Sequence, residues 1–160
     1  MAVKMLGLTG FLLALAALGG CGRSSPASSG PPVERGIFIS SDDCAQFGKL
    51  SIEECGQLID HAVALHQRLA PAYASLDACT AAEGKDRCAN GIDSKYHPTV
   101  AAFLITFGDK PSAQPLYGVS DASPGFKGLD KTKYALGDKD YSVSDSAEAI
   151  ARENAQGTKG

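Results

Sequence analysis

Five cysteines are the residues of this chain whose type and spacing most plainly suggest chemistry. One of them follows an apolar run near the N-terminus, and the other four share one stretch further on: Cys21, then Cys44, Cys55, Cys79 and Cys88. An odd number of thiols in an exported protein leaves one without a disulfide partner. The odd cysteine therefore needs a chemistry of its own.

The leader that precedes Cys21 indicates export. A single lysine is followed by an apolar stretch from Met5 to Leu18 and then by small residues, which is the order found in a secretory signal peptide. The stretch is about 14 residues long, whereas a spanning helix needs about 20. We therefore expect residues 1–20 to be a cleaved signal peptide and not a permanent anchor.

Residues 18–21, Leu-Gly-Gly-Cys, resemble the bacterial lipobox. In that class the thiol receives a diacylglycerol and the new amino terminus is acylated, and two or three acyl chains hold a protein stably to a bilayer. Gly22 stands where an aspartate would favour the inner membrane, so we expect Cys21 to anchor the chain to the periplasmic leaflet of the outer membrane. The alternative is a leftover thiol, which would be reactive in an oxidising compartment.

Four remaining cysteines predict two disulfides, with three possible connectivities. Local pairing, Cys44–Cys55 and Cys79–Cys88, is the favoured one. Nested pairing, Cys44–Cys88 with Cys55–Cys79, is the alternative and would hold two helices side by side. Zinc sites need cysteines two to four residues apart, and a redox pair needs Cys-x-x-Cys. Neither spacing occurs, so we expect no metal and a structural role.

The three histidines do not form a recognisable site. His61 and His66 are five residues apart, about 140° around a helix, so they do not share a face. We expect His66 to be a hydrogen-bonded interior residue, His61 to be solvated beside Asp60, and His97, which precedes Pro98 in a turn, to have no partner. The acids of the helix first turns are explained by capping and by the helix dipole: Asp42, Asp43, Glu53 and Glu54. No motif for a nucleophile, phosphate or cofactor occurs, so we expect no catalytic residue and no cofactor.

The elements that carry these residues can be placed by capping and periodicity. We expect a short helix from Ser41 to Gly48, a long amphipathic helix from Ser51 to Pro71, in which Ser51 and Glu54 form a capping box, and a short helix from Ser75 to Gly84. Leu58, Leu65 and Leu69 widen the apolar stripe of the long helix. A buried strand is expected at residues 99–108, loops from Asp109 onward, and a weak helix over residues 146–155.

These elements predict a mainly α, small disulfide-stapled α+β domain: short helix, long helix, short helix, a strand-like segment and an irregular C-terminal region. Residues 21–36, rich in Ser, Pro and Gly, are expected to be the lipidated cysteine and a flexible tether. The domain is expected over residues 37–118, and a polar, largely flexible region over 119–160. With a net charge of −3, the chain offers no electrostatic footprint for nucleic acid.

A succession of short segments carries a resemblance to a known family: "SSDDC", "EEC", "APAYASLDAC", "EGKDRC", an aromatic apolar segment and "QPLYG". It resembles the DUF1190 lipoproteins, a proteobacterial group of YgiB-type proteins, although the segment between "FLITFG" and "QPLYG" is shorter here. The family supplies no reaction, substrate or catalytic residues. Tyr73 and Tyr117 lie in its motifs, where they either pack over a disulfide or turn, or form a partner-binding surface.

The sequence therefore predicts a membrane-anchored envelope lipoprotein that acts as a non-catalytic accessory or binding module facing the periplasm. Its expected partners are the lipid bilayer, through acylated Cys21, and an envelope protein that the sequence does not identify. The alternative is a periplasmic enzyme with an unrecognised active site that uses a carboxylate or a histidine.

Overall fold

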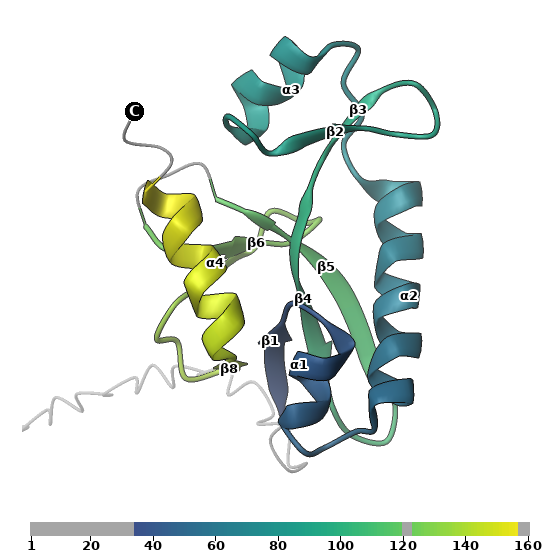
Figure 1. Ribbon diagram of the computed structural model, residues 1–160, viewed down its shortest axis with the longest axis vertical. Helices are drawn as coiled ribbons and strands as arrows, with labels where there is room; N and C mark the ends of the chain where they lie inside the picture. The colour runs from purple at the N-terminus through teal and green to yellow at the C-terminus, as the bar shows by residue number, and fades with distance from the viewer. Residues whose placement is uncertain (1–33, 120–122, 157–160) are drawn as a thin grey trace, which may run out of the picture. The chain divides into compact units, whose positions relative to one another are not determined.

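The computed structural model describes residues 34–119 and 123–156. The expected signal peptide, the lipidation site Cys21 and nearly all of the expected tether lie outside the described residues. The described part is an α+β domain in which four helices accompany a six-stranded sheet (Figure 1). In these described ranges, no helix is long and apolar enough to cross a membrane.

The six-stranded sheet joins the beginning and the end of the described chain. Its strands, in spatial order, are β7 (Lys133–Ala135), β6 (Gly125–Lys127), β5 (Ser112–Gly118), β4 (Val100–Thr106), β1 (Arg35–Phe38) and β8 (Ser142–Val143). All neighbours are antiparallel except β1 and β8, which are parallel. A separate two-stranded sheet pairs β2 (Cys88–Asn90) with β3 (Tyr96–Pro98).

Serine caps start three of the four helices where the sequence predicted them. The helices are α1 (Ser41–Gln46), α2 (Ile52–Leu69), α3 (Leu76–Glu83) and α4 (Asp145–Gln156). Ser40, Ser51 and Ser75 each accept a hydrogen bond from a first-turn backbone N–H. The capping box of Ser51 and Glu54 is present, so the predicted start of the long helix is confirmed.

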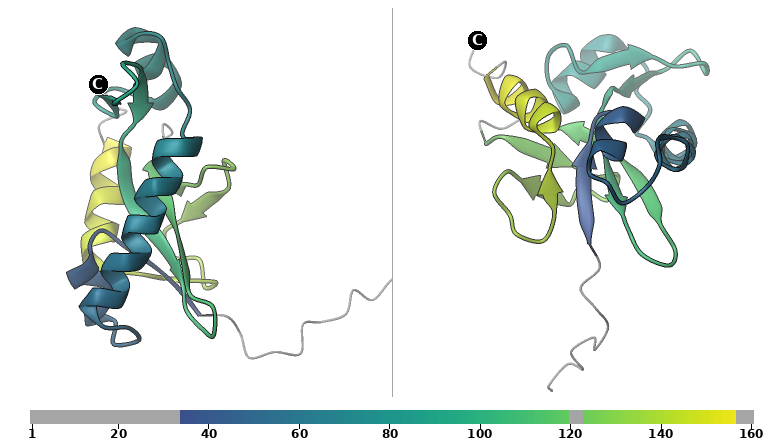
Figure 2. Two further views of the ribbon diagram at one scale, coloured as in Figure 1. Left: turned by 90° about the vertical axis from the view of Figure 1, so that its right-hand side faces the viewer. Right: turned by 60° about the horizontal axis from the view of Figure 1, so that its bottom comes forward.

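Alternation along the strands builds two cores, one on each face of the sheet. On one face, α1 and α2 pack against Phe38, Phe103 and Ile105. On the other face, α4 packs against residues of the intervening positions, such as Ile37 and Leu104. The two views of Figure 2 show α2 and α4 as separate layers around the strands.

The expectation of a mainly α domain with an irregular C-terminal region is wrong. Segment 112–118 lies in the region that was expected to be loops, yet it forms strand β5 beside β4. Proline is tolerated there because, in the part of the chain that the structure describes, β6 pairs with β5 only at Tyr117 and Gly118, so no described strand on that side needs an N–H from Pro115. The strand predicted at residues 99–108 is confirmed as β4.

The C-terminal part was misjudged because its elements give weak sequence signals. Strands β6, β7 and β8 are only two or three residues long, too short for alternation to be recognised. The helix predicted over residues 146–155 is confirmed as α4. It has one large apolar residue, Ile150, and packs instead through Ala147, Ala151 and Ala155, all of which are buried. Small residues let a helix approach a sheet closely. In a sequence, however, they do not distinguish a buried helix from an exposed one.

Both disulfides have the local pairing. Cys44–Cys55 joins α1 to α2 across a separation of 11 residues, and Cys79–Cys88 joins α3 to β2 across 9 residues. Cys44 and Cys55 belong to the core under α1 and α2. Residues 71–98, here named the hairpin unit, contribute no described residue to either core cluster.

Candidate functional site

Four polar side chains form a chain between helix α2, strand β5 and the hairpin unit. Nδ1 of His66 and the hydroxyl of Tyr117 are 3.0 Å apart and share a hydrogen bond. The His66 and His97 rings lie nearly perpendicular, with centroids 6.3 Å apart. Nε2 of His97 is 3.0 Å from Oδ1 of Asp93. Three elements far apart in sequence thus bring two imidazoles, a phenol and a carboxylate together.

The tight turn between β2 and β3 positions the Asp93–His97 pair. The backbone N–H of Gly91 donates to the carbonyl of Lys95 at 2.7 Å, and Oδ1 of Asp93 also accepts from the Lys95 N–H. A Cβ at Gly91 would lie 2.6 Å from Cδ2 of His97. A side chain at this position would therefore force the His97 ring to shift, because the imidazole occupies that space.

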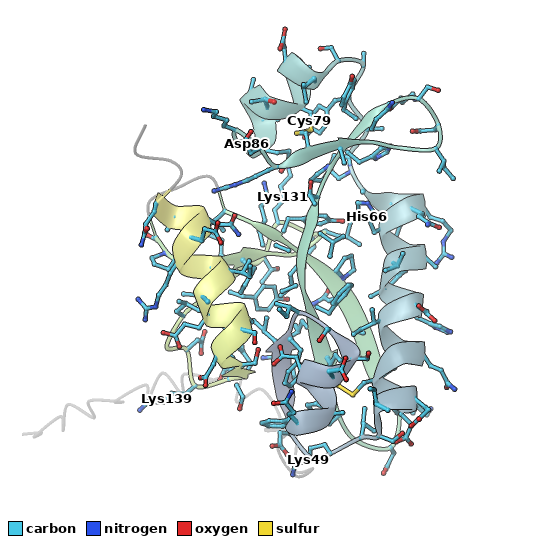
Figure 3. The ribbon with its side chains drawn as sticks, in the orientation of Figure 1. Lys49, His66, Cys79, Asp86, Lys131 and Lys139 are labelled. Atoms are coloured by element: carbon cyan, nitrogen blue, oxygen red, sulfur yellow. A yellow bond between two sulfur atoms is a disulfide. The ribbon has the colours of Figure 1, made fainter. Side chains whose placement is uncertain are left out.

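His66 reaches the cluster because it lies near the C-terminal end of α2 (Figure 3). Ala70 ends the helix in an extended conformation before Pro71, and the chain then turns into the hairpin unit. Backbone hydrogen bonds in both directions between Tyr73 and Tyr96, each 2.9 Å long, fasten that turn to β3. The end of α2 and the histidine strand are thereby held side by side.

A hollow of ≈ 390 Å³ opens beside the two histidines. Its lining combines apolar surface with a few polar groups: His66, His97, Asp93, Asn90, Pro98 and Val100. Such a mixture is typical of sites that bind small molecules or single side chains. Ile92, at the tip of the same turn, also lines the hollow and is 98% exposed.

The electrostatics of the hollow favour neutral imidazole at His66. Burial lowers the pKa of His66, and the neighbouring His97 lowers it further. The hydrogen bond from His97 lowers the pKa of Asp93, with a second contribution from the Lys95 backbone. Burial raises the pKa of Tyr117, as does the negative charge of Glu83. The site therefore combines a carboxylate, a neutral imidazole and a phenol that stays protonated.

A second polar cluster centres on Glu83, which is 6% exposed. Its two carboxylate oxygens accept from the Tyr73 hydroxyl and from Nζ of Lys127, each at 2.6 Å. Burial raises the pKa of Tyr73 to about 12, with a further contribution from its hydrogen bond to Glu83. Arg87 donates to the carbonyls of Val119 and Asn154. These groups satisfy one another and attach the hairpin unit to the sheet and to α4.

The structure places both predicted tyrosines and two of the three histidines in these clusters. Tyr117 is 3% exposed, so the idea that it forms a partner-binding surface is wrong: its ring is buried and its hydroxyl is directed to His66. Tyr73 is partly buried and its hydroxyl binds Glu83. His66 is hydrogen-bonded as expected, whereas the expectation that His97 has no partner is wrong, because Asp93 binds it.

Asp93 is the residue that sequence reasoning missed. It stands four positions before His97 in a turn, a spacing that brings both side chains to one side of a tight hairpin. The acids singled out earlier lie in helix first turns, and Asp43 accepts from the Ile39 N–H and from the distant Ser144 hydroxyl. Within 34–119 and 123–156, no group of three or more His, Cys, Asp or Glu side chains could hold a metal ion.

The arrangement can orient an imidazole toward a bound group. The Asp93 carboxylate binds Nε2 of His97 and so fixes the orientation of the ring, which leaves Nδ1 as its other nitrogen. That nitrogen can accept a hydrogen bond from a ligand or a proton from a reacting group. The geometry thus suits ligand recognition directly, and catalysis where a reactive partner is supplied.

Comparison with protein-family models shows to which family the chain belongs. A family model described as a protein of unknown function, DUF1190, matches residues 32–159. This chain belongs to the DUF1190 family. The match extends beyond the last of the family-like motifs, "QPLYG" at residues 114–118, to strands β6–β8 and helix α4. Neither curated proteins nor solved structures give a match.

Proposed function

We propose that this DUF1190 protein is a lipid-anchored lipoprotein of the bacterial cell envelope whose domain is a binding module facing the periplasm. The lipobox-like residues before Cys21 support the anchor, and Gly22 supports placement in the outer membrane. Two disulfides support export, because such bonds persist in oxidising compartments. The proposal assigns binding, not catalysis, to the folded domain.

The observation that carries the binding role is the hollow beside His97. It has apolar sides, a few fixed polar groups and an imidazole oriented by Asp93. Such a site recognises a ligand by shape and by one or two hydrogen bonds. The hollow lies between the end of α2 and the hairpin unit, and Val100 of β4 is part of its lining.

Site-specific photo-crosslinking in intact cells tests the binding role. A photo-reactive amino acid replaces Asn90, which is exposed at the hollow, in the otherwise native full-length protein. We expect a discrete crosslinked product that disappears in the Gly91→Ala variant, because the new Cβ displaces the His97 ring. Gly56→Ala is the matched control, since a Cβ at Gly56 meets nothing within 4 Å and the product should persist.

Two results would overturn the binding role. One is the absence of a discrete product from Asn90, and the other is an unchanged product in the Gly91→Ala variant.

The anchor is tested separately by metabolic labelling with a fatty-acid probe. The wild-type protein should take up the label, and a Cys21→Ala variant that still takes it up would contradict lipidation at Cys21.

The Asp93–His97 pair favours one second candidate, a periplasmic enzyme that uses His97 as a general base. Incubation of the purified protein with periplasmic small molecules, followed by mass spectrometry, distinguishes the two. An enzyme would consume a compound in a manner lost in the Asp93→Asn variant. A binding module would retain a compound without changing its mass.

A further inference from the structure

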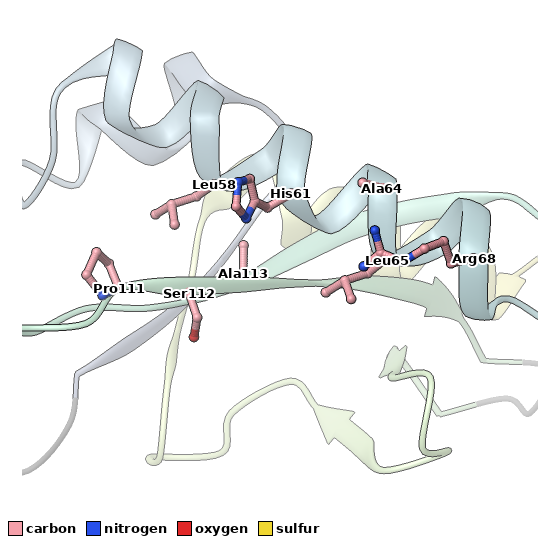
Figure 4. A pocket seen from close by; sticks show the side chains of 8 residues that line it. All are labelled: Leu58, His61, Ala64, Leu65, Arg68, Pro111, Ser112 and Ala113. Carbon is pink, nitrogen blue, oxygen red and sulfur yellow. The ribbon is translucent and has the colours of Figure 1, made fainter.

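Helix α2 carries more apolar surface than the cores cover. Ala62 is fully buried against the sheet, whereas Leu58 is only partly buried at the margin of that core. Leu65 belongs to neither core cluster. Both leucines line a groove of ≈ 380 Å³ between α2 and the first residues of β5, where Pro111 and Ala113 form the opposite wall (Figure 4).

The groove runs along most of the helix. A second hollow of ≈ 310 Å³ shares Leu58, His61 and Pro111 with the first and extends it toward Glu54. Arg68 lines the opposite end. From residue 54 to residue 68 a helix rises about 21 Å, which matches about six residues of extended chain.

The strand wall of the groove is an open sheet edge. Among the described residues, β6 pairs with β5 only at Tyr117 and Gly118, so Ser112 and Ala113 have a neighbouring strand on one side, β4. Pro115 further along β5 is fully buried and has no N–H, so the open edge is confined to the start of the strand. Unpaired strand edges are templates for the backbone of another chain. Addition of an extended peptide to an exposed sheet edge is a recurring mode of peptide recognition.

The register shows which backbone groups are available on this edge. The N–H of Phe107 donates to the carbonyl of Glu34 on the β1 side, so alternate residues of β4, such as Ile105, also face β1. Leu104 and Thr106 therefore face Gln114 and Ser112 of β5. Ala113, between these two, directs its N–H and carbonyl to the open edge.

We propose that the groove between α2 and β5 binds an extended peptide segment of a partner protein. The peptide adds to the edge of β5 at Ala113, inserts alternate apolar side chains against Leu58 and Leu65, and places an acidic residue beside Arg68. The N–H and the carbonyl of Ala113 are spaced to pair with an extended backbone in a sheet ladder, and neither a lipid nor a small anion offers both a donor and an acceptor at that spacing. Arg68 at one end and Glu54 at the other set the charge pattern of the peptide.

This site deepens the proposed binding role by naming a partner class, but it rests on different residues from the hollow beside His97. A groove that binds no peptide can therefore be distinguished from a hollow that binds no ligand. The Gly91→Ala variant should leave peptide binding in the groove unchanged. Variants in the groove should likewise leave the crosslink from Asn90 unchanged.

Selection from a random peptide library of about ten residues, displayed on phage, identifies the preference of the groove. The target is the full-length protein in lipid nanodiscs. We expect enriched peptides with apolar residues at alternate positions and an acidic residue near one end. Absence of enrichment, or a preference without alternation, would overturn the proposal.

Variants then test the contacts with an enriched peptide carrying a fluorescent label. Ala113→Pro removes the N–H at the open edge and should weaken binding about fivefold, the worth of about one hydrogen bond. Leu65→Ser should weaken it about tenfold through lost apolar contact. Leu69→Ser is the matched control, because Leu69 is 60% exposed on the same helix and does not line the groove.

Charge reversal supplies an independent readout. Arg68→Glu should weaken binding of the acidic peptide, and exchange of the acidic residue for lysine should restore binding to that variant. Circular dichroism establishes that each variant is folded. Equal affinities for all variants would contradict a site in the groove, and dimers formed through β5 would identify a second copy as the occupant in place of a peptide.

Discussion

At the scale of single residues, His66 is the side chain whose surroundings most clearly favour one protonation state. Burial and the adjacent His97 lower its pKa below the ordinary value of 6.5, and its Nδ1 is committed to Tyr117. The unfolded chain therefore binds a proton at this residue more readily than the folded chain. Stability contributed by His66 is complete above about pH 6.5 and decreases as the pH falls toward its folded pKa.

The His66→Gln variant tests this linkage. Glutamine does not titrate and can still hydrogen-bond the Tyr117 hydroxyl, so the acid-dependent loss of stability should be smaller in the variant. Urea unfolding at about pH 7.5 and about pH 5 measures the difference. If both proteins lose the same free energy of unfolding between these pH values, the lowered pKa of His66 does not contribute to stability. His61→Gln, at an exposed position of the same helix, serves as the control.

At the scale of elements, sequence patterns predicted a helix or strand correctly wherever a local interaction defines it. Ser51 and Glu54 mark the start of α2 by themselves, and the β-branched and aromatic run of β4 marks a buried strand. Strand β5 could not be predicted, because its proline is acceptable only at an edge whose existence depends on β6. The site was equally hidden, since Tyr117 meets His66 across 51 positions of sequence.

The join between α1 and α4 is an element-scale contact with a testable energy. Asp43 accepts from the Ile39 N–H at 3.0 Å and from the Ser144 hydroxyl at 2.6 Å, and Ser144 also accepts from the Ala147 N–H at the start of α4. Asp43→Ala should lower the free energy of unfolding by about 1–3 kcal/mol, because a partly buried donor loses its partner. Thermal melting measures this loss.

Asp42→Ala is the matched control for Asp43. Asp42 lies in the same first turn of α1 but is exposed, so its loss removes mainly an interaction with the helix dipole, worth about 0.3–1 kcal/mol. Equal destabilisation by the two variants would mean that Asp43 acts through the dipole and not through its contact with Ser144.

At the scale of the whole domain, the two disulfides have similar loops but different surroundings. Their sequence separations of 11 and 9 residues predict similar stabilisation by loop entropy, about 2.5–3 kcal/mol each. Cys44–Cys55, however, lies in the core beneath α1 and α2, whereas Cys79–Cys88 lies in the hairpin unit. The hairpin unit is attached to the rest by Glu83–Lys127 and by Arg87, which are polar contacts.

We therefore expect the two bridges to fail differently when each is replaced by a pair of alanines. Loss of Cys44–Cys55 should lower the melting temperature of the entire domain, because it opens a core that includes β1 and β4. Loss of Cys79–Cys88 should raise hydrogen exchange over residues 71–98 and leave the six-stranded sheet protected, because local units can open separately from a core. Hydrogen exchange read by mass spectrometry resolves the two patterns. Identical exchange profiles in the two variants would show that the hairpin unit and the sheet unfold as one cooperative structure, and the hollow beside His97 would then be as rigid as the core.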